Sequence, residues 1–194
     1  MSRTRTFIGV EIGEEIRNNS QSLQQTLGKT GAEVKWVTPE SMHITLLFLG
    51  EVDDRVLHTI CRAVSDIAAS EPPFTLRVSG VGAFPTLRRP KIAWGGVVDG
   101  AEQLRRLYSK LEAKLLDMGC YCKEERDYTP HLTLGRVKGE ADGFKLAPEL
   151  TKRLSWEGGR TVVNELLVFS SELERDGPVY TVLGRGELKA GAKN

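Results

Sequence analysis

Two short segments of this chain repeat one pattern of side chains that could do chemistry. His43-Ile44-Thr45-Leu46 lies near the start, and His131-Leu132-Thr133-Leu134 lies in the second half. In an extended strand, the His and Thr of each segment point to one face and the apolar residues point to the other. Two such strands facing each other would place two imidazoles and two hydroxyls in one cleft.

A cleft of this kind is suited to breaking a phosphodiester. Because histidine titrates at about pH 6.5, one imidazole can accept a proton while the other donates one. Cleavage needs both acts, since the attacking oxygen loses a proton and the departing oxygen gains one on the other side of phosphorus. The Thr45 and Thr133 hydroxyls could donate to non-bridging phosphate oxygens and stabilise the charge of the transition state. The repetition therefore favours reading His43 and His131 as a catalytic pair that works without a metal ion.

Arg136 follows the second segment, where a guanidinium could pair with a phosphate. Strict alternation along a strand puts Arg136 on the face opposite His131 and Thr133. Only a β-bulge, for example at Gly135, would turn the arginine toward the cleft.

Other site chemistries fit the sequence less well. His58, the third histidine, is in helical register with Arg62 and Asp66 and should face solvent rather than complete a zinc site. The three cysteines form no paired C-x-x-C elements. Gly28-Lys29-Thr30 resembles the end of a P-loop, but Leu23 stands where the upstream glycine is needed. We therefore expect no metal, no cofactor and no requirement for a nucleotide triphosphate.

The spacing of apolar residues predicts the elements that carry these side chains. We expect strands at 5–12, 42–49, 74–81, 91–98, 129–137, 161–170 and 179–188, and helices at 14–27, 53–69, 101–118 and 147–154. In the helix at 101–118, for example, Leu104, Leu107, Leu111 and Leu115 recur at three- and four-residue steps. Each half of the chain places its His-x-Thr-Leu segment on the strand after its first helix.

This order of elements predicts an α+β fold with antiparallel sheets, because the strands lack the continuous apolar runs of a buried parallel sheet. The repeat predicts two similar lobes related by a pseudo-twofold axis. Each lobe would be an antiparallel sheet with flanking helices, and the active-site cleft would lie between the lobes. We expect residues 1–194 to form a single bilobal domain, with a first repeat at about 5–85 and a second at about 90–188.

The charge balance limits the classes of partner. Lys and Arg number 27 against 26 Asp and Glu, which excludes a strongly basic nucleic-acid binder and leaves recognition of an anion to a local patch. Arg88-Arg89-Pro90-Lys91, read as a loop before a strand, is either such a patch or a solvated loop. The start of the chain lacks a secretory signal and no segment is apolar enough to span a membrane. We expect a cytoplasmic monomer that does not bind membranes.

The residues around the two segments resemble the two-histidine phosphoesterase superfamily. More specifically, they look like its RNA 2′,3′-cyclic phosphodiesterase branch, which is also called the 2′-5′ RNA ligase family. The matching residues are 36–37, 42–52, 84–85, 130–136 and 177–180.

The resemblance implies hydrolysis of a terminal 2′,3′-cyclic phosphate on RNA to a 2′-phosphomonoester, together with a weak reverse ligation of 2′-5′ bonds. It implies that His43 donates a proton to the departing 3′ oxygen and that His131 accepts a proton from water. It also implies that Thr45 and Thr133 hold the phosphate and that Arg136 matches the arginine of the family's second motif. Phe48 stands at the corresponding place in the first motif, so the two halves are not equivalent.

Alternatives remain open at this point. The substrate could be a small cyclic nucleotide or a 2′-5′ oligoadenylate, and turnover of mononucleotides and oligonucleotides would separate these readings. A module that binds RNA ends without turnover is the alternative outside enzymes. The two intact His-x-Thr pairs disfavour it, because binding alone needs no proton donor and acceptor.

Overall fold

A computed structural model of the chain describes residues 2–121, 127–174 and 177–189. In chain order its elements are β1 (Arg3–Glu11), α1 (Glu14–Gly28), β2 (Val34–Trp36), the 3-10 helix η1 (Pro39–Ser41), β3 (His43–Asp53), α2 (Asp54–Ala69), β4 (Phe74–Thr86), β5 (Arg89–Val97), α3 (Ala101–Asp117), β6 (His131–Val137), α4 (Glu140–Thr151), β7 (Glu157–Val163), β8 (Glu165–Leu173) and β9 (Pro178–Glu187).

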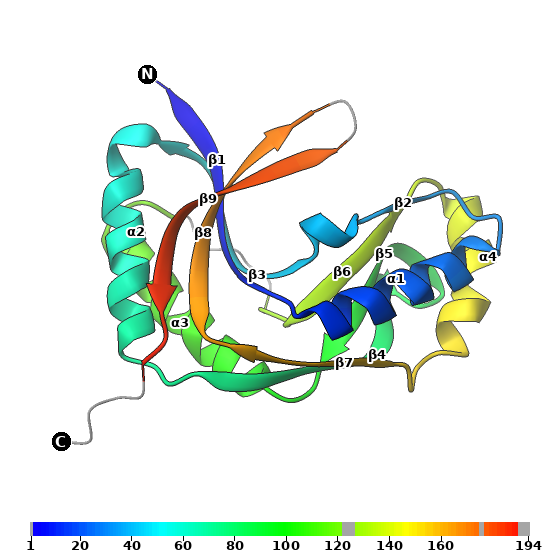
Figure 1. Cartoon of the computed structure of the whole chain (residues 1–194). Coiled ribbons are helices and arrows are strands. Elements are labelled where there is room, and N and C mark those ends of the chain that lie inside the picture. The colour runs from blue at the N-terminus through cyan, green and yellow to red at the C-terminus, as the bar shows by residue number, and fades with distance from the viewer. Residues whose placement is uncertain (1, 122–126, 175–176, 190–194) are drawn as a thin grey trace.

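The strands build two antiparallel sheets, one in each lobe (Figure 1). The four-stranded sheet has the order β3-β1-β8-β9, and the five-stranded sheet has the order β2-β6-β5-β4-β7. Helices α2 and α3 lie on the four-stranded sheet, and α1 and α4 lie on the five-stranded sheet. This arrangement confirms the predicted α+β fold of two antiparallel lobes with flanking helices.

Each lobe draws on both halves of the chain. The four-stranded sheet joins β1 and β3 to β8 and β9, while β4 leaves the first half to pair with β5 and β7. Helix α1 follows β1 of the four-stranded sheet, yet it packs against β7 of the five-stranded sheet. The predicted repeats at 5–85 and 90–188 are therefore not the two lobes, and the division at these bounds stays a prediction.

Several predicted elements differ from the structure in extent, and two of them differ in more than a terminus. The strand expected at 161–170 is two strands in different sheets, since β7 ends at Val163 and β8 begins at Glu165. The polar pair Asn164-Glu165 stands at the crossing, but two polar residues within an otherwise strand-like segment do not by themselves show that the chain changes sheets. The helix expected at 147–154 is α4, which already begins at Glu140. Gly143 weakens the helical pattern there, but a side chain at this position would contact the Pro90 carbonyl oxygen at 3.0 Å.

The segment expected to be a loop before β5 is a tight hairpin. Strand β4 continues to Thr86, β5 begins at Arg89, and Pro85 pairs with Pro90. The short strand β2 and the helix η1 were not predicted from the sequence, because three-residue elements have too little periodicity to be recognised.

One hydrophobic core runs through both lobes. It includes Ile8 of β1, Leu76 of β4, Leu132 of β6 and Leu166 of β8, all fully buried. The apolar stripe predicted for α3 is buried in the same core, which confirms the helical register.

Among the described residues, no helix is both long enough and apolar enough to cross a membrane.

Candidate active site

Each of the two motif strands carries a bulge at the leucine of its motif. On β6, consecutive residues of β5 pair with Thr133 and Gly135, so Leu134 is an extra residue. On β3, the corresponding extra residue is Leu46. Because one extra residue shifts the alternation by one position, the residue five places after each histidine returns to the histidine's face.

Arg136 and Phe48 hold that position on the two strands. Both line the cleft that contains the histidines. The bulge that is needed to turn Arg136 toward the cleft is therefore present, and its extra residue is Leu134 rather than Gly135. Gly135 lies beneath the indole of Trp36, where a Cβ atom would be only 2.6 Å from the ring.

One cavity of about 390 Å³ brings together all five side chains singled out in the sequence. Its lining comprises His43, Thr45, His131, Thr133 and Arg136, together with Arg5, Phe7, Val37, Ser41, Phe48, Ser171 and Tyr180. Within the described part of the chain, this lining holds two guanidinium groups and no carboxylate. Such a charge pattern suits an anionic ligand.

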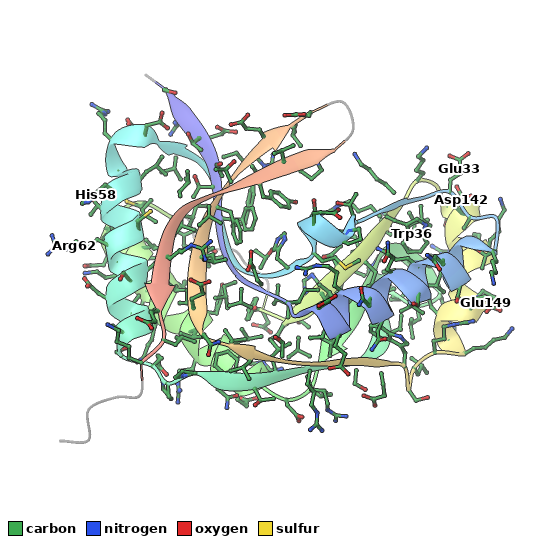
Figure 2. All side chains as sticks on the ribbon, viewed as in Figure 1. Glu33, Trp36, His58, Arg62, Asp142 and Glu149 are labelled. Carbon is green, nitrogen blue, oxygen red and sulfur yellow. The ribbon has the colours of Figure 1, made fainter. Side chains whose placement is uncertain are left out.

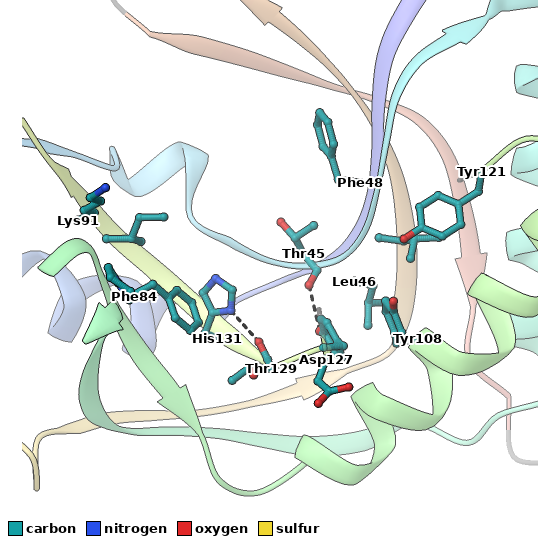
Figure 3. Close-up of a pocket in the computed structure, with 14 residues that line it drawn as sticks. Thr45, Leu46, Phe48, Phe84, Lys91, Tyr108, Tyr121, Asp127, Thr129 and His131 are labelled. Atoms are coloured by element: carbon teal, nitrogen blue, oxygen red, sulfur yellow. Dashed lines mark hydrogen bonds between the residues drawn. The ribbon is translucent and has the colours of Figure 1, made fainter. Parts of the chain in front are cut away.

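The two imidazoles are held by the same kind of hydrogen bond. The Nδ1 atom of His43 donates to the Ser41 carbonyl at 2.8 Å. The Nδ1 atom of His131 donates to the Thr129 carbonyl at 2.7 Å, as Figure 3 shows. Because a carbonyl oxygen only accepts, Nδ1 carries the hydrogen in both rings and Nε2 is left to exchange a proton. The Nε2 atom of His43 lies 3.0 Å from the Thr45 hydroxyl oxygen.

Aromatic side chains fix the orientation of both rings. Phe7 stacks on His43 with ring centroids 4.7 Å apart, and Tyr180 meets the same imidazole edge-on at 5.1 Å. Phe84 meets His131 edge-on at 5.0 Å. These contacts shield the rings from water.

Burial lowers the pKa of both histidines below the ordinary value of 6.5. The hydrogen bonds to the Ser41 and Thr129 carbonyls act in the opposite direction, because they favour the charged ring. Repulsion from His131 lowers the pKa of His43 further, and the Arg136 guanidinium lowers that of His131. In the free protein at neutral pH, both rings therefore favour the neutral form.

A larger cavity, of about 690 Å³, adjoins the cleft (Figure 3). The two share Thr45, Phe48 and His131. The rest of the larger lining is mostly apolar and aromatic, and comprises Leu46, Leu47, Phe84, Pro85, Lys91, Ile92, Tyr108, Tyr121, Asp127, Tyr128 and Thr129.

Sequence reasoning missed two polar residues that hold the motif strands. The Tyr128 hydroxyl donates to the Thr45 carbonyl at 2.9 Å, and its ring stacks on Tyr108. Gln24 is buried and bonds to the bulge of β6. Gln24 could have been noticed, because helical spacing puts it on the buried face of α1 one turn after Ser20. Tyr128 lies outside any periodic element and leaves no such signal.

His58 and Gly28 lie outside the lining of the cleft. His58 and Arg62 point away from α2 into solvent, which confirms their predicted exposure (Figure 2). Among the described residues, no group of three or more His, Cys, Asp or Glu side chains is arranged to hold a metal ion. Gly28 is the last residue of α1, whereas a P-loop precedes a helix.

Comparisons with known proteins agree on one family. A family model described as LigT like Phosphoesterase matches residues 10–94 and again residues 96–180. The RNA 2′,3′-cyclic phosphodiesterase of Methanothermobacter thermautotrophicus is 37% identical over 179 residues, covering 92% of this chain and 96% of the relative. The Thermotoga maritima protein of the same name is 32% identical over 187 residues, covering 96% and 97%. The crystal structure of TT0787 from Thermus thermophilus has a TM-score of 0.80 at 30% identity, covering 95% of this chain and 97% of that one.

Proposed function

Since this chain belongs to the LigT-like phosphoesterase family, we propose that it hydrolyses the 2′,3′-cyclic phosphate at the end of an RNA. Its relatives in Methanothermobacter and Thermotoga carry the name of that activity. The observation that supports the proposal most strongly is the cleft, where two imidazoles held by the same kind of Nδ1 hydrogen bond lie beside two threonines and two arginines.

In the proposed mechanism, Nε2 of neutral His131 accepts a proton from water as the water oxygen bonds to phosphorus. The bond from phosphorus to the 3′ oxygen breaks, and Nε2–H of protonated His43 donates its proton to that oxygen. The products are a 2′-phosphomonoester and a 3′-hydroxyl. The two histidines end with exchanged protonation states, which solvent resets. No metal ion takes part.

The negative charge of the bound substrate favours the protonated form of His43, which is the form that can act as the acid. Burial favours the neutral ring in the free protein, but a phosphodiester anion beside it favours the imidazolium. Protonation turns Nε2 from an acceptor into a donor, so the Thr45 hydroxyl no longer donates to the ring. That hydroxyl can then donate to a non-bridging oxygen, as Thr133 and Arg136 do from the other strand.

The adjoining cavity supports a nucleotide end as the substrate class. Its volume of about 690 Å³ accommodates a nucleoside, and its aromatic lining offers flat apolar surfaces to a base. The cavity opens beside the phosphate cleft at Thr45, Phe48 and His131, so a ribose phosphate could span both.

Histidine variants test the acid and base. We expect His43→Ala and His131→Ala each to lower kcat on an oligonucleotide with a 2′,3′-cyclic phosphate by about 10² to 10⁴, because each removes one positioned proton transfer. Circular dichroism should remain unchanged. Near-normal turnover by either folded variant contradicts the pairing of these two residues.

Excess chelator tests the absence of a metal from the reaction. The rate on the same oligonucleotide should not change when the protein is dialysed against EDTA. Activity that disappears on chelation and returns with zinc would rule out the metal-free mechanism.

Two substrate comparisons separate the related activities. Faster turnover of a cyclic mononucleotide or of 2′-5′ oligoadenylate than of the RNA end would replace the proposed substrate, and tight binding without cleavage would favour an RNA-end binding module. Ligation would use the same proton transfers, with the 5′-hydroxyl of a second RNA attacking the cyclic phosphate in place of water, so that a 2′-5′ diester forms as the bond to the 3′ oxygen breaks. Ligation is tested by mixing the two RNA ends and assaying for a 2′-5′ linkage.

A further inference from the structure

We propose that Gln24 is a positioning residue for Arg136, because its side-chain amide holds the bulge that turns Arg136 into the cleft. The inference rests on the proposed function in one respect only, namely that Arg136 binds the phosphate of the substrate. Gln24 does not line the cleft, and it acts on the ligand through the backbone of β6.

Gln24 is only 7% exposed, and its amide nitrogen is fully hydrogen-bonded. Its Nε2 atom donates to the Val37 carbonyl at 2.8 Å and to the Leu134 carbonyl at 2.9 Å. These two bonds use both hydrogens of the amide nitrogen. A buried amide costs free energy unless it is hydrogen-bonded, so its position in the interior needs this pair of acceptors.

Leu134 is the extra residue of the bulge, and its carbonyl oxygen accepts two hydrogen bonds. Besides the Gln24 amide, it accepts the Val37 backbone N–H at 3.0 Å. Gln24 thus ties α1, the segment after β2 and the bulged residue of β6 into one closed set of bonds. If β6 lost the bulge and returned to regular alternation, Arg136 would point away from His131.

The other motif strand is held differently, which provides an internal comparison. There the Tyr128 hydroxyl bonds to the Thr45 carbonyl next to the extra residue Leu46, and Phe48 stands where Arg136 stands on β6. Loss of the Tyr128 bond should therefore disturb the His43 strand and leave the placement of Arg136 intact.

A double-mutant cycle with inorganic phosphate as the probe tests the inference. In the wild-type background, Arg136→Ala should weaken competitive inhibition by phosphate and lower kcat/KM about 10- to 100-fold, the range expected for a hydrogen bond between charged groups. In the Gln24→Met background, Arg136→Ala should change both quantities less than about threefold, because Arg136 is already misplaced. An equal effect of Arg136→Ala in the two backgrounds overturns the inference.

The adjacent Gln25 is a matched control, since it is an exposed glutamine on the same helix. Gln25→Met should leave the Arg136→Ala effect at its wild-type size, and so should Tyr128→Phe. A reduced Arg136→Ala effect in either background would mean that general loosening of the fold, rather than the Gln24 amide, displaces Arg136.

Gln24→Asn covers the case in which Gln24→Met fails to fold. It keeps the amide but shortens the side chain by one methylene, so the amide recedes from both carbonyls, and the same reduction of the Arg136→Ala effect is expected. Phosphate binding followed by the NMR signals of the histidines needs no turnover. A wild-type protein that bound phosphate but cleaved no cyclic phosphate would refute the proposed function, while the cycle measured by binding would still decide the role of Gln24.

Discussion

His43 and His131 present Nε2 to the cleft because each Nδ1 hydrogen is taken by the carbonyl two residues earlier in the chain. The local sequence around each motif therefore sets the tautomer. What differs between the two rings is the neighbouring charge, since Arg136 lies beside His131. That asymmetry suits His131 to the role of base, because a nearby cation favours the neutral ring.

The pH dependence of kcat/KM follows from these shifts. Since burial and the Arg136 charge lower the pKa of His131, the neutral base persists below pH 6.5, and the acid limb of the profile should have its midpoint below that value. Arg136→Ala removes one of the lowering effects, so the midpoint should move toward higher pH although the rate is smaller. Rates measured from pH 4 to pH 9 for both proteins check this, and a midpoint that stays fixed or moves down contradicts it.

At the scale of elements, the bulges explain why the residues at positions one, three and six of each motif share a face. A regular strand would place only the first and third together. Next to the bulge on β3, Gly9 of β1 pairs with Thr45, and the two strands approach each other closely. A Cβ atom on Gly9 would lie 2.7 Å from the Ile44 carbonyl oxygen.

Gly9→Ala should therefore push β1 and β3 apart. Because the contact is with backbone and not with a flexible side chain, we expect a loss of about 1–3 kcal/mol in the free energy of unfolding, measured by urea titration, together with a lower kcat/KM. Gly28→Ala at the end of α1 is the control, since its Cβ would meet only the Trp36 indole nitrogen at 4.0 Å. Equal stabilities of the two variants would show that β1 and β3 tolerate a wider separation.

At the scale of the whole molecule, the exchange of elements between the lobes makes the cleft a product of the complete chain. Strands β8 and β9 complete the lobe that holds His43, and β4 completes the lobe that holds His131. Since each sheet contains strands from both halves, neither lobe can form its sheet without the other half. That the chain is a monomer and that it is cytoplasmic stay predictions, and light scattering against the mass of 21.5 kDa tests the first.

The interlocked lobes should unfold as one cooperative unit. All three tryptophans, Trp36, Trp94 and Trp156, lie in the lobe with the five-stranded sheet, so their fluorescence reports on that lobe. Leu166→Ala removes core volume from the other lobe, on β8, and should cost about 2–5 kcal/mol. The fluorescence transition in urea should shift as far as the transition followed by circular dichroism. A fluorescence midpoint that stays in place would show that the lobes unfold independently.

The sequence by itself determined the local part of this protein. The two His-x-Thr-Leu segments, most helices and strands, and the antiparallel α+β class follow from side-chain type and periodicity, which act over a few residues. The tertiary structure decided which segments meet. In the folded structure β4 and α1 lie in the other lobe from β1 and β3. The bulge at Leu134 orients Arg136, and Gln24, on a helix far away in the sequence, donates a hydrogen bond to that bulge. These outcomes depend on burial and hydrogen bonding between residues far apart in the chain, and no local pattern records them.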